Sequence, residues 1–162
     1  MGVEIKVVKF LNPQSFNVII GQAHFIKTVE DIYEALITAS VCIKFGLAFC
    51  EASQKALVRS SGNDAELEKL AVENALQIGA GHSFVTILKD AFPINVLNAI
   101  KNVPEVCRIF CATSNPLEIV IAESAQGRAI LGVVDGVKPK GVETATDRQQ
   151  RQEFLRHINY KF

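Results

Sequence analysis

The hydrophobic residues of this chain change their spacing repeatedly, and each change marks a new element. Residues 41–51 alternate strictly, which is the pattern of a β-strand with two different faces. One face carries Ile43, Phe45, Leu47 and Phe49, and the other carries Cys42, Lys44, Gly46, Ala48 and Cys50. The second face is small enough either for close packing or for a ligand surface.

Alternation or short apolar runs predict eight strands, and a period of three to four residues predicts four helices. The strands are residues 4–10, 17–25, 41–51, 56–59, 84–89, 106–112, 118–123 and 129–134. The helices are residues 28–40, 63–78, 94–101 and 146–157. This order predicts an α/β protein with one domain over residues 1–162, a mixed β-sheet sandwich covered by helices.

Polar residues at the starts of two predicted helices fit a capping box. Thr28 stands three residues before Asp31, and Asn63 stands three residues before Glu66. We expect Thr28 and Asn63 to be the N-caps of their helices. Gly21, inside a predicted strand, indicates a bulge or a close approach of another chain segment.

Composition and charge exclude some classes of partner. Hydrophobic residues make up 49% of the 162 residues, and 17 basic residues balance 17 acidic ones. A neutral chain lacks the basic surface that binds nucleic acid or a membrane. It also lacks a strong net charge to keep copies apart, so we expect a homo-oligomer. Neither a leader peptide nor an apolar run of membrane-spanning length is recognisable, which predicts a cytoplasmic protein.

Cysteine and histidine spacings give no indication of a metal site. Four cysteines occur in apolar segments without a Cys-x-x-Cys pair, and we expect buried free thiols in a reducing compartment. His24, His82 and His157 do not have the spacing of metal ligands either.

The turn Gly79-Ala80-Gly81-His82 is the strongest candidate for a binding site. Glycines let the backbone take positive φ angles, and successive amides in such a turn can bind an anion. A histidine there can donate, accept or carry a charged group near neutral pH. The alternative is that Gly79 only ends a helix and His82 only begins a strand.

Further polar side chains lie at strand ends. Lys44 and Arg128 are candidates to neutralise a phosphate, and Asn115 and Asp135 are candidates to hold a ribose or a base. Lys44 and Glu51 are either a polar pair within a sheet or a solvated edge. The common ATP-phosphate loop, Gly-x-x-x-x-Gly-Lys followed by Ser or Thr, is absent from the sequence.

Six segments spread over nearly the whole chain resemble one known family. They are residues 43–53, 79–84, 92–97, 112–117, 127–136 and 154–156. In their order and composition they are similar to the adenosine-specific kinases, which are small archaeal and bacterial proteins. The resemblance implies a protein that binds adenosine or AMP and carries a phosphoryl group on a histidine, which corresponds to His82. It also implies a homo-oligomer, in particular a trimer.

These observations define a set of expected ligand contacts and three functional hypotheses. The expected contacts, besides His82, are Gly79, Ala80, Gly81, Ser83, Lys44, Asn115, Arg128 and Asp135. The first hypothesis is a nucleoside kinase or phosphotransferase with His82 as nucleophile. The second is a non-catalytic adenosine or AMP sensor. The third is a structural oligomer whose small strand face around Gly46 and Ala48 packs against a neighbouring copy.

Overall fold

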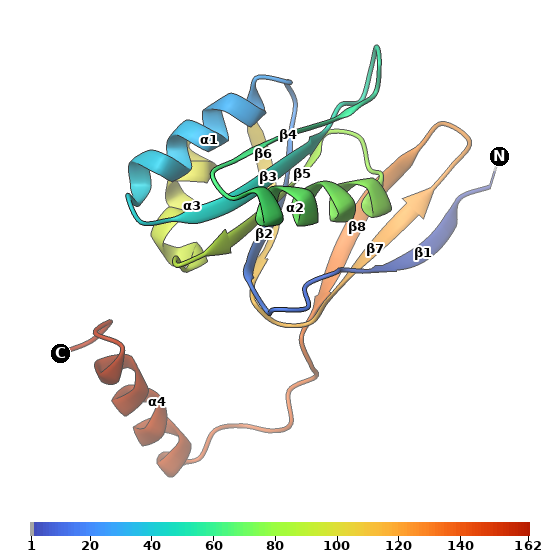
Figure 1. Ribbon diagram of the computed structural model, residues 1–162. Coiled ribbons are helices and arrows are strands. Elements are labelled where there is room, and N and C mark those ends of the chain that lie inside the picture. The colour runs from blue at the N-terminus through green and yellow to red at the C-terminus, as the bar shows by residue number, and fades with distance from the viewer. Residues whose placement is uncertain (1) are drawn as a thin grey trace.

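The computed structural model describes residues 2–162, which form two β-sheets and four helices (Figure 1). The larger sheet has the order β4 (Val58–Gly62), β3 (Lys44–Cys50), β5 (Ser83–Lys89), β2 (Asn17–Ala23) and β6 (Val106–Thr113). The smaller sheet has the order β1 (Glu4–Lys9), β7 (Leu117–Glu123) and β8 (Arg128–Asp135). The helices are α1 (Thr28–Ala39), α2 (Ala65–Ile78), α3 (Pro93–Lys101) and α4 (Ala145–His157).

The structure confirms the predicted α/β sandwich, and each of the twelve predicted elements is present. Within both sheets every strand pair is antiparallel. A single isolated bridge, between Ala80 and Arg128, runs parallel and links the end of α2 to the smaller sheet. No helix of residues 2–162 combines the length and the apolar character needed to cross a bilayer.

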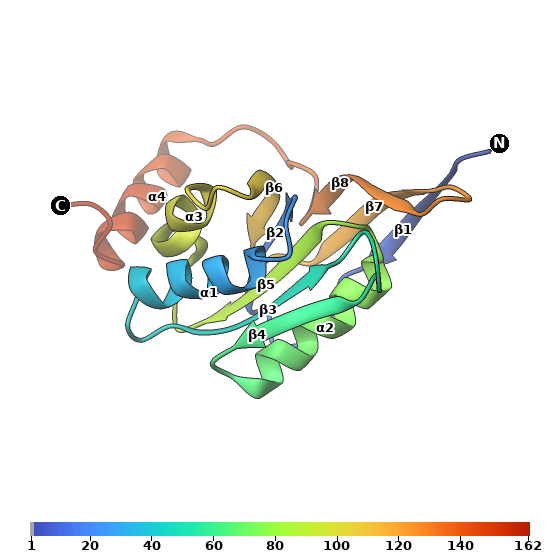
Figure 2. The same cartoon turned by 90° about the horizontal axis from the view of Figure 1, so that it is seen from above.

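Two hydrophobic layers lie on opposite faces of the larger sheet. One layer joins the face that carries Phe45, Leu47 and Phe49 to α1 and α3 (Figure 2). The other joins the opposite face to α2 and to the inner residues of the smaller sheet, such as Ile119 and Ile121. The strict alternation along β3 therefore separates the two layers, because successive side chains of a strand point to opposite faces.

Helix α2 covers the small face of β3. Gly46 and Ala48 are buried there, and a Cβ atom at Gly46 would overlap the backbone of Leu67 and Glu68. The hypothesis that this face packs against a neighbouring copy is therefore wrong, since a helix of the same chain already occupies it. The small residues serve close packing of a helix on a strand.

Gly21 combines both features expected of a glycine within a strand. The register of β2 against β6 shifts between Ile20 and Gly21, which marks a bulge. A Cβ atom at Gly21 would lie 2.7 Å from the carbonyl oxygen of Arg108 and would overlap the ring of Phe84.

The expected N-caps are wrong by one residue in both helices. Lys27 precedes α1 without a capping hydrogen bond from its side chain, and Thr28 is buried in the first turn with its hydroxyl donating to the Phe25 carbonyl. At α2 the cap is Asp64, whose carboxylate accepts from the amides of Glu66 and Leu67.

Asn63 has a different role from the predicted one. Its side chain accepts from the Phe45 amide at 2.9 Å and donates to the Ile43 carbonyl at 2.8 Å. It therefore ties the loop before α2 to the start of β3, because tertiary hydrogen bonds satisfy this amide better than a helix end does.

The C-terminal arm, residues 136–162, extends away from the two sheets and ends in α4 (Figure 1). None of the residues of α4 is buried, and Phe154 and Phe162 are exposed. A hydrogen bond of 3.4 Å from Asn95 to the Tyr160 hydroxyl joins the arm to α3. The arm thus presents apolar side chains that the rest of its own chain leaves uncovered.

We predict that Gly46→Ala lowers the free energy of unfolding by about 3 kcal/mol, since the added methyl group must displace α2 from β3. Gly132→Ala is the matched control, because nothing lies within 4 Å of a Cβ atom there and we expect a change within about 0.5 kcal/mol. Urea denaturation measures both. Equal stability of the two variants would contradict the close packing of α2 on β3.

Candidate functional site

The glycine turn begins as the C-terminal cap of α2. Gly79 adopts a left-handed conformation with φ of 60°, and its amide donates to the Ala75 carbonyl at 2.9 Å. The alternative interpretation of Gly79 as a helix cap is therefore confirmed for its backbone. Its amide is already used, so it is not free to bind a phosphate as we expected.

His82 has a fixed backbone and a free imidazole. Its φ is 64°, its amide donates to the Cys50 carbonyl at 2.7 Å, and its carbonyl accepts from the Ala23 amide at 2.9 Å. Its ring stacks on Phe49 with centroids 5.9 Å apart and an interplanar angle of 18°. Within residues 2–162 neither imidazole nitrogen forms a hydrogen bond, which leaves both available to a ligand.

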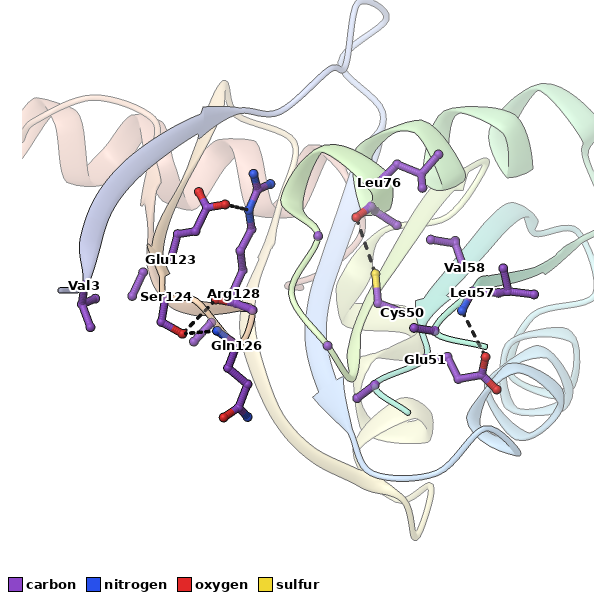
Figure 3. Close-up of a pocket in the computed structure, with 18 residues that line it drawn as sticks. Val3, Cys50, Glu51, Leu57, Val58, Leu76, Glu123, Ser124, Gln126 and Arg128 are labelled. Atoms are coloured by element: carbon purple, nitrogen blue, oxygen red, sulfur yellow. Dashed lines mark hydrogen bonds and ion pairs between the residues drawn. The ribbon is translucent and has the colours of Figure 1, made fainter. Parts of the chain in front are cut away.

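A groove of about 670 Å³ opens beside this turn, between the β7–β8 hairpin and the loop after β3 (Figure 3). We call it the hairpin groove. Leu57, Val58 and Leu76 form an apolar wall, and Gly79 and Gly81 lie at its base. The opposite wall is polar and carries Glu123, Ser124, Gln126 and Arg128. Its volume lies in the usual range of small-molecule sites.

Ion pairs fix the charged side chains of this groove. The Arg128 guanidinium lies 3.3 Å from Glu123 through Nε and donates to the Gln77 carbonyl at 3.0 Å. Hydrogen bonds from Lys6 and Arg128 hold the pKa of Glu123 below its usual value. The polar wall therefore presents an ordered pair of opposite charges.

Glu51 on the facing loop is ionised in the same way. The Leu57 amide and the Arg59 guanidinium both donate to its carboxylate, and they lower its pKa, the amide most. Lys44 lies at the other end of β3, so the predicted alternative of a Lys44–Glu51 pair is wrong.

A second, smaller pocket of about 280 Å³ lies beside the same turn, and we call it the basic pocket. It shares Gly81, Arg128 and Ala129 with the hairpin groove. Its other polar residues are Gln22, Ser83 and Arg108. Sequence reasoning missed Arg108, which stands within a strand rather than at a strand end, and it missed the hairpin residues Glu123 and Gln126.

The structure brings together only part of the predicted site. At one end of the sheets the two pockets are lined by Gly79, Ala80, Gly81, Ser83 and Arg128. His82 lies in the same turn, but it lines neither pocket. Asn115 and Asp135 lie at the opposite end of the β7–β8 ladder, which spans about 20 Å. There the Asn115 amide and the Thr113 hydroxyl donate to Asp135, at 3.0 and 2.7 Å, and form a closed turn. Lys44 opposes Lys89, also far from His82.

The expectation that all four cysteines are buried is wrong for Cys42 and Cys107, which are exposed. Cys50 and Cys111 are buried, and burial raises the pKa of both thiols, that of Cys111 to about 12. Cys50 lines the hairpin groove, where its thiol donates to the Ala75 carbonyl.

A family model and solved structures match this chain. The model of a family described as adenosine specific kinase matches residues 8–161. Among solved structures, the crystal structure of the PH1918 protein from Pyrococcus horikoshii OT3 is similar, with 48% sequence identity and a TM-score of 0.95. The alignment covers 99% of each chain. No curated protein matches this chain.

Proposed function

Because this chain belongs to the adenosine-specific kinase family, we propose that it binds adenosine and AMP and passes a phosphoryl group through His82. The observation that carries the proposal is the family match over residues 8–161, combined with an ordered turn that holds His82 and whose glycines line a nucleoside-sized groove. The rival function is a sensor that binds the same nucleoside without transfer.

The two walls of the hairpin groove suit the two halves of a nucleoside. Leu57, Val58 and Leu76 offer the apolar surface on which a purine base packs. Ser124, Gln126 and Glu123 offer hydrogen-bond partners for ribose hydroxyls and for the polar edge of adenine. This division supports adenosine as the ligand of the groove.

Phosphoryl transfer between AMP and His82 needs no further reactant. The lone pair of a neutral imidazole nitrogen attacks phosphorus, an N–P bond forms, and the bond from phosphorus to the 5′-oxygen breaks. The 5′-oxygen takes up a proton and leaves as adenosine. The reverse reaction returns the phosphoryl group to adenosine, and the free nitrogens of His82 suit either direction.

We further propose a homo-oligomer, a trimer in keeping with the family resemblance. The outer face of the smaller sheet is apolar and exposed, with Val3, Ile5 and Val7 from the first strand region and Leu131 and Val134 from β8. The C-terminal arm adds further uncovered apolar side chains. Contiguous apolar surface of this kind marks a contact with another molecule.

We also propose that the protein works in a reducing compartment, the cytoplasm. Its four cysteines are free, and two of them are exposed to solvent. Exposed thiols persist where thioredoxin and glutathione keep them reduced.

We predict that adenosine and AMP bind more tightly than ATP, since the two joined pockets have room for a nucleoside and one phosphate-sized anion. Titration calorimetry with adenosine, AMP and ATP measures the three affinities. ATP binding tenfold tighter than AMP, a difference of about 1.4 kcal/mol, would contradict the assignment of the pockets.

We predict that His82→Asn abolishes phosphohistidine formation and phosphoryl transfer while the fold is retained. Asparagine tolerates the left-handed backbone of this position, so we expect a stability loss of about 1 kcal/mol or less. Mass spectrometry of protein incubated with AMP detects the modification, and His24→Asn, at an exposed histidine, is the control. Full transfer by His82→Asn would rule out the nucleophile, and absence of transfer by the unaltered protein would favour the sensor.

Sedimentation equilibrium at micromolar concentration is expected to give three times the chain mass of 17.7 kDa. The physical reason is the apolar area left uncovered on the smaller sheet and the arm. Ile5→Lys, on the exposed face of the edge strand β1, is expected to shift the distribution toward single chains. A single 17.7 kDa species for the unaltered protein would exclude the oligomer.

A further inference from the structure

The geometry points to a phosphate subsite in the basic pocket, and we propose that Arg108 and Arg128 hold one phosphate dianion there. The inference rests on the proposed function in one respect, that the adjoining hairpin groove takes the nucleoside. It adds the residues that distinguish AMP from adenosine, and it gives Arg108 a role that its position in the sequence does not suggest.

Three neighbouring strands build the floor of the pocket. Gln22 of β2 pairs in register with Ser83 of β5 on one side and with Arg108 of β6 on the other. All three line the pocket together with Phe110 of β6, which packs against the layer between the two sheets. The beginning of β8 closes the pocket with Arg128, Ala129 and Ile130.

The charges that line this pocket favour an anion. Arg108 is exposed and forms no ion pair with any of residues 2–162, so its guanidinium group is free to bind an anion. Arg128 pairs with Glu123, and Lys6 pairs with both Glu123 and Glu4, so these four charges balance. The lining of the basic pocket itself contains two arginines and no acidic residue. The Arg108 guanidinium offers the planar donor set that phosphate oxygens accept. Arg128 adds the N–H donors that its bonds to Glu123 and to the Gln77 carbonyl leave free.

The pocket also contains a neutral hydrogen-bond donor, and its volume suits a phosphate group. The Gln22 side chain supplies a neutral amide donor at the centre of the floor. Ser83 is only 2% exposed, and its hydroxyl donates to the Ala80 carbonyl at 2.7 Å, so it fixes the turn beside the pocket. A volume of about 280 Å³ admits a phosphate group together with ordered water.

Shared walls connect this subsite to the hairpin groove. Gly81, Arg128 and Ala129 line both cavities, so a ligand in the groove can extend past them into the basic pocket. Adenosine then fills the groove alone, whereas AMP fills the groove and places its phosphate between the two arginines.

The test is calorimetric titration of the full chain with adenosine, AMP and inorganic phosphate in a phosphate-free buffer. For Arg108→Gln we expect AMP binding at least tenfold weaker, loss of inorganic phosphate binding, and adenosine binding within twofold of the unaltered protein. Arg108→Lys keeps the charge but loses the planar donors, so an intermediate AMP affinity is expected. Arg151→Gln, which removes an exposed guanidinium from α4, is the matched control and leaves all three affinities unchanged.

Three results separate this inference from the proposed function. The subsite is overturned if Arg108→Gln leaves the ratio of AMP to adenosine affinity unchanged. It is also overturned if Arg151→Gln weakens AMP binding as much as Arg108→Gln does. Binding of phosphate but not adenosine by the unaltered protein refutes the nucleoside groove and leaves the subsite standing. Thermal unfolding of each variant shows whether the fold is retained, and Arg108→Lys provides the second measurement if Arg108→Gln does not fold.

Discussion

The backbone hydrogen bonds of residues 79–83 are the constraint on which the rest of this structure depends. Gly79 ends α2, and Ala80 bridges to the smaller sheet at Arg128. His82 bonds to the end of β3 through its amide and to the end of β2 through its carbonyl. Four separate segments are therefore held at one short turn. A turn fixed from so many sides keeps a strained, left-handed histidine, because the surrounding bonds outweigh the strain.

The sequence was sufficient to predict the elements of the fold because each depends on local spacing. The alternation in β3 and the three-to-four period of α2 correspond to the faces that are buried. Local reasoning failed where a tertiary contact competed with a local one. Asn63 bonds to the start of β3 and leaves the cap of α2 to Asp64, and Gly46 packs under α2 rather than against another copy.

Of the candidate site, only the glycine turn at residues 79–83 was predictable from the sequence. The other predicted residues stand at strand ends, and the direction of each strand decides which of these ends lie close together. Lys44 begins β3 and Ser83 begins β5, and the first residues of two antiparallel neighbours lie at opposite ends of the strand pair. Asn115 and Asp135 are separated from the turn in the same way, by the length of the β7–β8 ladder. Arg108 comes near Arg128 because β6 lies beside β8 across the gap between the sheets, and nothing in the local sequence encodes that neighbourhood.

The imidazole of His82 and the basic pocket lie toward opposite faces of the larger sheet. The ring of His82 stacks on Phe49, which belongs to the layer under α1 and α3. Gln22, Ser83 and Arg108 line a pocket against Phe110 and Ile130, which pack in the opposite layer. A phosphate held by the two arginines is thus near the His82 backbone but not against its imidazole. Transfer from AMP to His82 therefore needs a second position of the phosphate, at the imidazole, so AMP binding and phosphoryl transfer depend on different side chains.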